Sequence, residues 1–210
     1  MDPIDPEQIK CVVFDFGFTL SPDYYFNVTP PGCPEWHAVI QKVIFGEPAI
    51  VKPWMKGKLS SLDIAAILSR HFSLDIPTIV ATMEKGCHQL HFNQAVWDFA
   101  VAQKAAGRKT ALVTDNMDVF SKVVVPCHGL AALFDVILNS ADFHEIRKEL
   151  LWPIAFERLG GGISYANSLL IEDGESEPAM FRALGGVAHQ YTNDTAFVEW
   201  LDSIDWSRQP

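Results

Sequence analysis

The stretch Lys10–Leu20, KCVVFDFGFTL, is an apolar run that carries a single carboxylate, Asp15, into a turn. Its β-branched and aromatic residues favour a strand that is covered on both faces of a sheet. A carboxylate at the end of such a strand costs free energy to bury, which indicates that it has a function there. Gly17 gives the backbone freedom just after it, and Thr19 supplies a nearby hydroxyl. The pattern is typical of an aspartate nucleophile beside a metal ion, although an aspartate that caps the turn would look the same.

The composition is that of a globular protein with an acidic balance. Its 210 residues, 49% of them hydrophobic, suffice for one sizeable core or for a core domain with a smaller insert. A formal net charge of −10 argues against nucleic acid or an anionic membrane as a partner. We find no secretory signal and no run near the roughly 18 apolar residues of a membrane span. The four scattered cysteines indicate reduced thiols, so we expect a cytoplasmic protein, as a monomer or homodimer.

From residue 93 onward, the sequence alternates helical and extended patterns. Apolar residues recur at helical spacing after Asn93, and Gly107 is placed to end that helix. Such alternation predicts an α/β fold: a Rossmann-like, doubly wound parallel sheet with helices on both faces. The expected helices span 93–106, 118–128, 153–159, 179–184 and 195–201, and the expected strands after the first span 110–113, 134–138, 168–171 and 187–191.

Residues 21–92 interrupt this alternation. The segment opens with a proline-rich loop and then carries helical patterns without a convincing strand. Ser60, with Asp63 three residues later, is typical of a capping box at the start of a helix. We therefore interpret the chain as an α/β core domain, residues 1–20 and 93–210, and a small helical cap domain, residues 21–92.

Side chains suited to an anion follow the strand predicted at 110–113. Thr114 ends that strand with a hydroxyl, and Asp115 and Asn116 follow where backbone N–H groups would open a helix. A hydroxyl and exposed amides donate together to an anion such as phosphate. The same residues would also serve to cap a helix. Both interpretations are open from these residues alone.

Charged residues mark two more strand ends. Arg147 and Lys148 precede the helix predicted at 153–159, where a cation would offset a nucleophilic carboxylate and a bound phosphate. A solvated basic pair is the commoner finding for such residues. Glu172 and Asp173 directly follow another apolar strand. Two acids in that place suit a hard cation such as Mg²⁺ better than they suit an exposed loop.

These four segments resemble, in order, the four motifs of the haloacid dehalogenase superfamily. In the first motif a strand ends in Asp-x-Asp-x-Thr/Val; Asp15 takes the place of the nucleophile and Thr19 that of the threonine. Gly17 replaces the second aspartate, which in the family's phosphatases protonates the leaving group and activates water. The segment 54–60, WMKGKLS, also looks like part of the cap of members with a helical insert after the first motif.

The resemblance implies a role for each strand-end residue. Lys148 is the expected lysine of the third motif, with Arg147 as a rival, and Thr114 inherits a phosphate contact. The implied catalytic residues are Asp15, Thr114 and Lys148; the implied substrate-binding residues are Thr114, Asp115, Asn116 and Lys148; the implied Mg²⁺ ligands are Asp15, the carbonyl of Gly17, Asp173 and Glu172.

These roles imply a Mg²⁺-dependent phosphatase of a small phosphorylated metabolite that works through an aspartyl-phosphate at Asp15. With glycine at position 17, the open alternatives are a substrate with a good leaving group, another acid such as Asp23, or a binding protein without efficient turnover. A metal-independent haloacid dehalogenase is the alternative enzyme, although a metal-free site gains little from two extra carboxylates. Tyr24 and Tyr25 are expected to belong to the core of the cap rather than to contact substrate.

Overall fold

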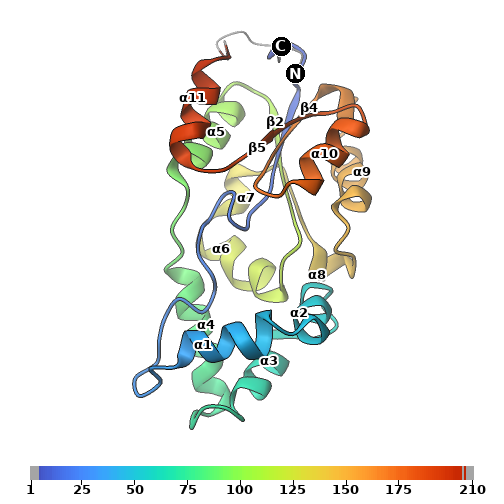
Figure 1. Cartoon of the computed structure of the whole chain (residues 1–210). Coiled ribbons are helices and arrows are strands. Elements are labelled where there is room, and N and C mark those ends of the chain that lie inside the picture. The colour runs from blue at the N-terminus through green and yellow to red at the C-terminus, as the bar shows by residue number, and fades with distance from the viewer. Residues whose placement is uncertain (1–4, 205, 207–210) are drawn as a thin grey trace.

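A five-stranded parallel sheet forms the centre of the structure, a computed structural model that describes residues 5–204 and 206 (Figure 1). Its strands are β1 (Cys11–Phe14), β2 (Lys109–Thr114), β3 (Val136–Asn139), β4 (Ser168–Glu172) and β5 (Val187–Gln190). They lie in the order β3-β2-β1-β4-β5. The central strand β1 pairs with β2 and β4, which sets Phe14 between Leu112 and Ile171. This arrangement confirms the predicted α/β fold with a doubly wound parallel sheet.

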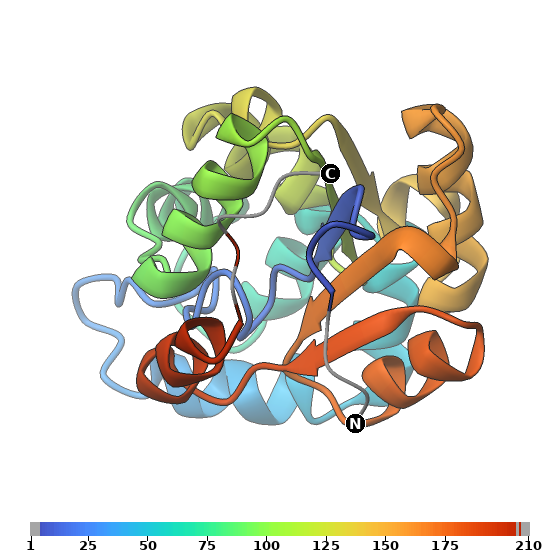
Figure 2. The same ribbon diagram turned by 90° about the horizontal axis from the view of Figure 1, so that it is seen from above.

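Helices cover both faces of the sheet (Figure 2). Successive side chains of a strand point to opposite faces, so a strand without polar residues needs cover on both. Phe14 packs edge-on against Phe99 on one face, whereas Val13 joins the hydrophobic cluster around Trp152 on the other. The helices are α5 (Gln94–Ala105) and α11 (Asp194–Asp202) on the first face, α9 (Lys148–Leu159) and α10 (Ser176–Ala183) on the second, and the shorter η2 (Phe120–Val124), α6 (Val125–Cys127), α7 (Leu130–Leu133), α8 (Ser140–Phe143) and η3 (Tyr165–Asn167).

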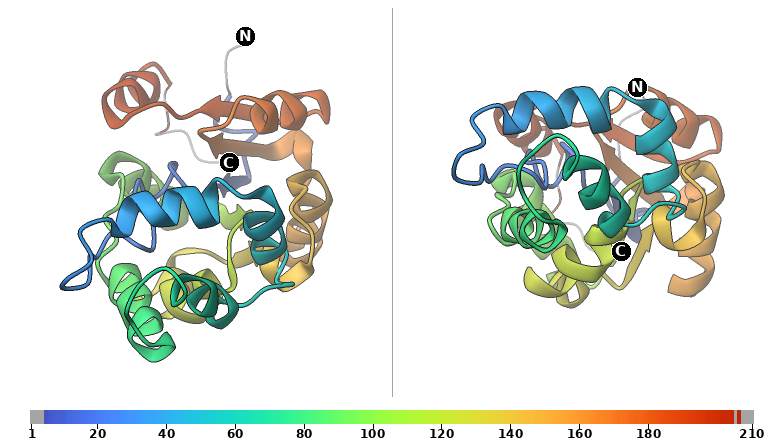
Figure 3. Two further views of the ribbon diagram at one scale, coloured as in Figure 1. Left: turned by 60° about the horizontal axis from the view of Figure 1, so that its bottom comes forward. Right: turned by 90° about the horizontal axis from the view of Figure 1, so that it is seen from below.

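The segment between β1 and α5 forms a group of helices across the carboxyl ends of the strands (Figure 3). These cap helices are α1 (Trp36–Ile40), η1 (Gln41–Phe45), α2 (Pro48–Met55), α3 (Ser61–Leu68) and α4 (Ile76–His88). Their buried residues, among them Trp36 and Trp54, belong to the same hydrophobic cluster as Phe14 of the sheet. The division into two domains stays a prediction, because cap and sheet bury their side chains together.

One buried carboxylate, Asp118, fastens the cap helices to the chain that follows β2. The indole Nε1 of Trp54 donates to Asp118 Oδ1 at 2.9 Å, and the hydroxyl of Ser61 donates to the same oxygen at 2.6 Å. Nearby, Gly57 lies so close to α8 that a Cβ atom there would come within 2.3 Å of the carbonyl oxygen of Ala141. The tryptophan and the glycine of WMKGKLS thus lie where the cap touches the core.

Several helices differ from those expected, three of them for a reason that involves proline or a division of the helix. α9 begins at Lys148 rather than near Pro153, so the proline lies inside the helix. Its ring removes one hydrogen bond close to the amino end, and packing on the sheet outweighs that loss. The helix expected at 118–128 is divided into η2 and α6, and α2 was not expected although Pro48 occupies its first position. Within the described ranges, no helix is both long and apolar enough to cross a membrane.

Candidate active site

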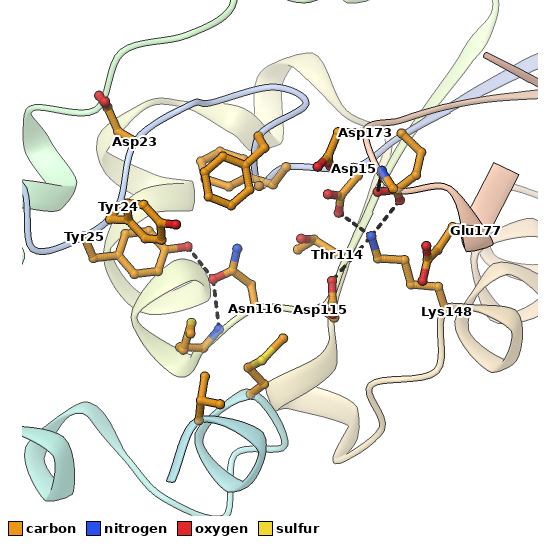
Figure 4. Close-up of a pocket in the computed structure, with 18 of the residues that line it drawn as sticks. Asp15, Asp23, Tyr24, Tyr25, Thr114, Asp115, Asn116, Lys148, Asp173 and Glu177 are labelled. Carbon is orange, nitrogen blue, oxygen red and sulfur yellow. Dashed lines mark hydrogen bonds and ion pairs between the residues drawn. The ribbon is translucent and has the colours of Figure 1, made fainter. Parts of the chain in front are cut away.

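A cavity of about 440 Å³ lies between the carboxyl ends of the strands and the cap helices (Figure 4). Asp15 enters it directly after β1, and its backbone N–H continues the strand pairing by donating to Ile171 O at 3.0 Å. The side chain of Asp15 is only 5% exposed. A short apolar strand between two neighbours therefore delivers one buried carboxylate to a defined point of the cavity.

The ammonium group of Lys148 joins three carboxylates in the cavity. Its Nζ atom lies 2.8 Å from Asp15 Oδ1, 2.7 Å from Glu172 Oε2 and 3.4 Å from Asp115 Oδ1. Burial alone would lower the pKa of Lys148, but Asp15 and Glu172 raise it well above its usual value. Lys148 is therefore a permanent cation at the centre of the site.

Arg147 points elsewhere. Its guanidinium pairs with Glu145 at 2.7 Å, and 61% of its side chain is exposed. Because α9 begins at Lys148, the first helical residue turns inward while the preceding one stays at the surface. Of the two basic residues weighed for the third motif, the structure thus brings Lys148 to the cavity.

Thr19 connects the first and fourth motifs. Its hydroxyl donates to Asp173 Oδ1 at 3.1 Å and accepts from the backbone N–H of Asp173 at 2.9 Å. The reciprocal pair holds the loop after β4 against the loop after β1, so Asp173 is positioned by a residue more than 150 positions earlier. Thr19 is fully buried and acts as a positioning residue rather than as a substrate contact.

Oxygen atoms of Asp15, Glu172 and Asp173 lie within 4.8 Å of one another. Lys148 balances only one of these three carboxylates. Burial, followed by the charge of Asp15, raises the pKa of Glu172 to about 8 and also raises the pKa of Asp173. The raised pKa values mean that too little positive charge surrounds these carboxylates. A hard divalent cation would supply that charge. This donor set fits Mg²⁺.

Gly17 lies at the edge of the same cavity. Its carbonyl oxygen accepts a hydrogen bond from the backbone N–H of Thr19 at 2.7 Å, which leaves one lone pair for another partner. A Cβ atom at this position would meet no atom within 4 Å. Gly17 as a carbonyl ligand of Mg²⁺ stays a prediction, and the space beside it is wide enough for a side chain.

The three residues after β2 have different surroundings. Thr114 is buried and lines the cavity, and its hydroxyl makes no hydrogen bond to another described side chain. Asn116 is tied down, because its Oδ1 accepts from the Tyr25 hydroxyl and from the N–H of Met117. Asp115 turns its carboxylate towards Lys148, where it competes with a bound anion. Thr114 is therefore the best placed of the three to donate to a phosphoryl oxygen.

Asp23, the substitute acid considered for position 17, lines the cavity but has its carboxylate engaged by His91. Its carboxylate accepts from the backbone N–H of His91 at 2.7 Å and pairs with Nδ1 of the same residue at 2.8 Å. Figure 4 shows it turned away from Asp15. The sequence neighbourhood suggested a substitute acid, but Asp23 is bound by His91, in the segment between α4 and α5, and turns away from Asp15.

Tyr24 lines the cavity and is 43% exposed, so its expected place in the core of the cap is wrong. Tyr25 is buried, as expected, although it also reaches the cavity wall. No sequence pattern distinguished these two neighbours, because the choice depends on how the loop after β1 crosses the strand ends. The cavity wall on the side of the cap is formed by Phe18, Tyr24, Tyr25, Phe45, Val51 and Met55.

Comparisons with known proteins place the fold. The sequence matches no protein-family model and no curated protein. A HAD family enzyme from Bacteroides thetaiotaomicron, in complex with magnesium and inorganic phosphate, is 14% identical with a TM-score of 0.64, over 88% of this chain and 94% of its own. A predicted HAD-like family hydrolase from Porphyromonas gingivalis is 14% identical with a TM-score of 0.68, over 93% and 97%.

An L-2-haloacid dehalogenase from Xanthobacter autotrophicus is 16% identical with a TM-score of 0.61, over 94% of this chain and 84% of that one. All three structures resemble this chain in fold over most of its length. The chain therefore has the fold of the haloacid dehalogenase superfamily, as its four motifs predicted.

Proposed function

We propose that this chain is a Mg²⁺-dependent phosphohydrolase that cleaves a small phosphate monoester through an aspartyl-phosphate at Asp15. The observation that carries the proposal is the cluster of Asp15, Glu172 and Asp173, in which Lys148 pairs with Asp15 and Glu172 and no described cation pairs with Asp173. Three ionised carboxylates and one ammonium would repel a phosphate dianion, whereas a divalent cation would neutralise the cluster and give the phosphoryl oxygens a positive partner. The magnesium and phosphate bound by one similar structure support this proposal.

In the first step, a carboxylate oxygen of Asp15 attacks phosphorus while the bond from phosphorus to the leaving oxygen breaks. Lys148 stays charged throughout and faces the phosphoryl oxygens, and Thr114 donates its hydroxyl to one of them. Mg²⁺ held by Asp15, Asp173 and Glu172, with the Gly17 carbonyl, would supply further positive charge at these oxygens. Because Gly17 has no side chain, the leaving group departs as an anion and takes its proton from water.

In the second step, water cleaves the aspartyl-phosphate and releases inorganic phosphate, which restores Asp15. No carboxylate at position 17 activates this water, so its deprotonation falls to the solvent or to another acidic side chain of the cavity, such as Glu177. General acid–base assistance is typically worth about 10²–10⁴ in rate. We therefore expect slow turnover on alkyl phosphates and faster turnover on substrates with good leaving groups.

A second candidate is metal-independent hydrolysis of a carbon–halogen bond. The apolar wall on the side of the cap and the absence of an acid at Gly17 favour it, because halide departs without protonation. Against it, such a site would contain Glu172 and Asp173, whose raised pKa values show that their ionisation lacks a cation, and carbon–halogen cleavage gives neither acid a role. The phosphohydrolase proposal accounts for both acids, and the dehalogenase accounts for neither.

The decisive experiment measures release of phosphate from phenyl phosphate and of chloride from 2-chloropropionate, each in Mg²⁺ and in EDTA. Phosphate release that needs Mg²⁺ and disappears in Asp15→Asn is the expected result. Asp98→Asn serves as a matched control, since this exposed carboxylate on α5 accepts a hydrogen bond from Gln94, outside the cavity lining. Mass spectrometry of the protein during turnover should detect the phosphorylated Asp15.

Each contrary result has a distinct meaning. Chloride release that persists in EDTA would replace the phosphohydrolase with the dehalogenase. Binding of Mg²⁺ and phosphate without turnover of either substrate, and with no effect of Asp15→Asn, would make the chain a binding protein.

A further inference from the structure

The cavity has two chemically distinct ends. The acidic end holds Lys148 and five carboxylates, three of which engage its ammonium, whereas the sixth lining carboxylate, Asp23, lies beside Tyr24 and is bound by His91. The end formed by the cap and the loop after β1 presents no cationic side chain among the described residues that line it. A substrate whose phosphoryl group lies at Asp15 would thus place the rest of its structure against apolar and aromatic side chains.

Three aromatic rings form the mouth of this apolar end. The ring centres of Phe18 and Tyr24 are 5.2 Å apart, and those of Tyr24 and Phe45 are 5.3 Å apart. At these distances the rings pack against one another as a continuous wall and leave no open cage between them. Phe18 and Tyr24 nevertheless remain 47% and 43% exposed, so aromatic surface is free to contact a ligand.

Phe18 occupies a conformation that does not suit it. Its φ angle is +54°, the left-handed region that glycine adopts freely and that bulky residues rarely enter. Its backbone is fixed there by a hydrogen bond from Phe18 N to Ser21 O at 2.8 Å. An exposed phenylalanine in this conformation contributes little to the stability of the fold. A strained residue at the edge of a cavity is typical of a functional constraint.

The absence of an acidic side chain at Gly17 also favours a substrate with an aromatic leaving group. Without an acid at this position, a leaving group that is stable as an anion is favoured. A phenol, with a pKa near 10, leaves far more readily as an anion than an aliphatic alcohol, whose pKa is close to that of water, about 15.7. The residue beside the nucleophile and the aromatic wall thus favour the same leaving group.

We propose that the substrate is an aryl phosphate whose aromatic leaving group stacks on Phe18 and Tyr24. This inference rests on the proposed phosphohydrolase function and names its substrate class. The Asp15 oxygen–phosphorus bond forms, the phosphorus–aryl oxygen bond breaks, and the electron pair leaves on the phenolate, which takes a proton from water. A second water then hydrolyses the aspartyl-phosphate, so that aryl phosphate and water yield phenol and inorganic phosphate.

Binding must be separated from leaving-group chemistry, because aryl phosphates also react faster on any phosphatase. Phenylphosphonate and methylphosphonate resemble the substrate without a cleavable ester. We expect calorimetry in Mg²⁺ to give about a tenfold lower Kd for phenylphosphonate. In Phe18→Gly, whose new residue fits the φ of +54°, this preference should fall to about twofold while methylphosphonate binds as before.

Two further variants identify the cause of that change. Phe18→Ala lacks the ring without the flexibility of glycine, and it should lose the preference equally. Tyr24→Leu should reduce it partly, whereas Leu184→Ala, an exposed apolar residue far along the chain on α10's carboxyl end, should leave it unchanged. Melting temperatures of all variants establish that each is folded.

The outcomes separate this inference from the function on which it rests. Equal affinity for both phosphonates, or a preference that survives in Phe18→Gly, overturns the aryl substrate and leaves the phosphohydrolase standing. Faster turnover of choline phosphate than of phenyl phosphate would also overturn it, in favour of a cationic leaving group. Failure to bind either phosphonate in Mg²⁺ contradicts the phosphohydrolase itself and with it the inference.

Discussion

The positive charge of Lys148 in the cavity cannot be supplied by the adjacent residue Arg147. It is the cation that touches Asp15 and Glu172, and all three side chains are at most 5% exposed. Arg147, the adjacent residue, is bound to Glu145 at the surface. The two residues therefore form a natural pair for testing what a cation contributes at the cavity.

Lys148→Met should lower kcat/KM for phenyl phosphate by roughly 10² or more, because the phosphoryl oxygens lose a fixed positive charge. It should also destabilise the fold by about 3–5 kcal/mol, since Asp15 and Glu172 are left buried without their partner. Arg147→Met should change kcat/KM by less than about twofold, since surface ion pairs contribute little. Steady-state kinetics and urea denaturation of both variants test this, and equal losses would contradict the assignment.

Gly17 offers the opposite experiment, a gain of activity. Its φ is not in the left-handed region, and a Cβ atom there would meet nothing within 4 Å, so an aspartate fits. Gly17→Asp should raise kcat for glycerol 3-phosphate by roughly 10–10³, because a general acid would protonate the alkoxide. Turnover of phenyl phosphate should change by less than about threefold. Gly17→Asn has the same shape without an acid, and an equal gain in that variant would disprove the explanation.

At the scale of elements, α2 and α8 meet through a glycine. Gly57 and Gly129 have φ angles of +62° and +63°, but only at Gly57 does a neighbouring backbone atom, Ala141 O, block the Cβ position. Gly129→Ala should cost about 1 kcal/mol for its φ alone. Gly57→Ala should cost at least about 2 kcal/mol more, because the cap must also move. Urea denaturation measures both, and equal costs would show that the close approach has no energetic weight.

β5 and α11 meet through His189, whose ring stacks on Trp200 with centres 3.8 Å apart. Burial, followed by the charge of Arg182, lowers the pKa of His189 to about 4. The unfolded chain, with a pKa near 6.5, therefore takes up the proton first as the pH falls. The stability contributed by neutral His189 is complete above about pH 6.5 and is lost towards pH 4.

Between pH 7 and pH 5 the wild-type protein should lose about 1–2 kcal/mol more of its free energy of unfolding than His189→Gln loses. Chemical denaturation at both pH values measures the difference. Because carboxylates titrate in both proteins alike, they cancel in the comparison. Identical pH profiles would show that folding does not lower the pKa of His189.

At the scale of the whole molecule, the fold concentrates part of a formal net charge of −10 at one point. Among the described residues that line the cavity, Lys148 is the single basic one. The six acidic ones are Asp15, Asp23, Asp115, Glu172, Asp173 and Glu177. Since Mg²⁺ would bind the folded but not the unfolded chain, the cation should stabilise the entire protein.

Saturating Mg²⁺ should raise the melting temperature of the wild-type protein by roughly 5 °C, as expected for about 2–3 kcal/mol of linked binding. Asp173→Asn should reduce this shift, because it removes one of the three converging carboxylates. Asp98→Asn should retain the full shift. Differential scanning fluorimetry with and without EDTA provides the measurement, and a wild-type protein that does not respond would exclude the metal site.

Much of this molecule could be predicted from residue order. The alternation of helical and extended patterns after residue 93 predicted the parallel sheet, because each periodicity can be recognised within a short stretch of sequence. Ser60 and Asp63 form the capping box that their spacing predicted. Element bounds were less accurate: Lys148 begins α9 because packing on the sheet carries the helix past Pro153. The strand-end residues Asp15, Thr114, Glu172 and Asp173 were found because parallel strands present their carboxyl ends at one edge.

By itself, the sequence determined which side chains lie at the strand ends and which position lacks its usual acid. Only the tertiary structure decided that Lys148 rather than Arg147 enters the cavity, that Asp23 turns to His91, and that Phe18 and Tyr24 line the cavity. The physical reason is the sequence distance over which each kind of interaction acts. Periodicity and capping act over a few neighbouring residues, whereas these side chains are oriented by contacts between segments of the chain that are distant in sequence.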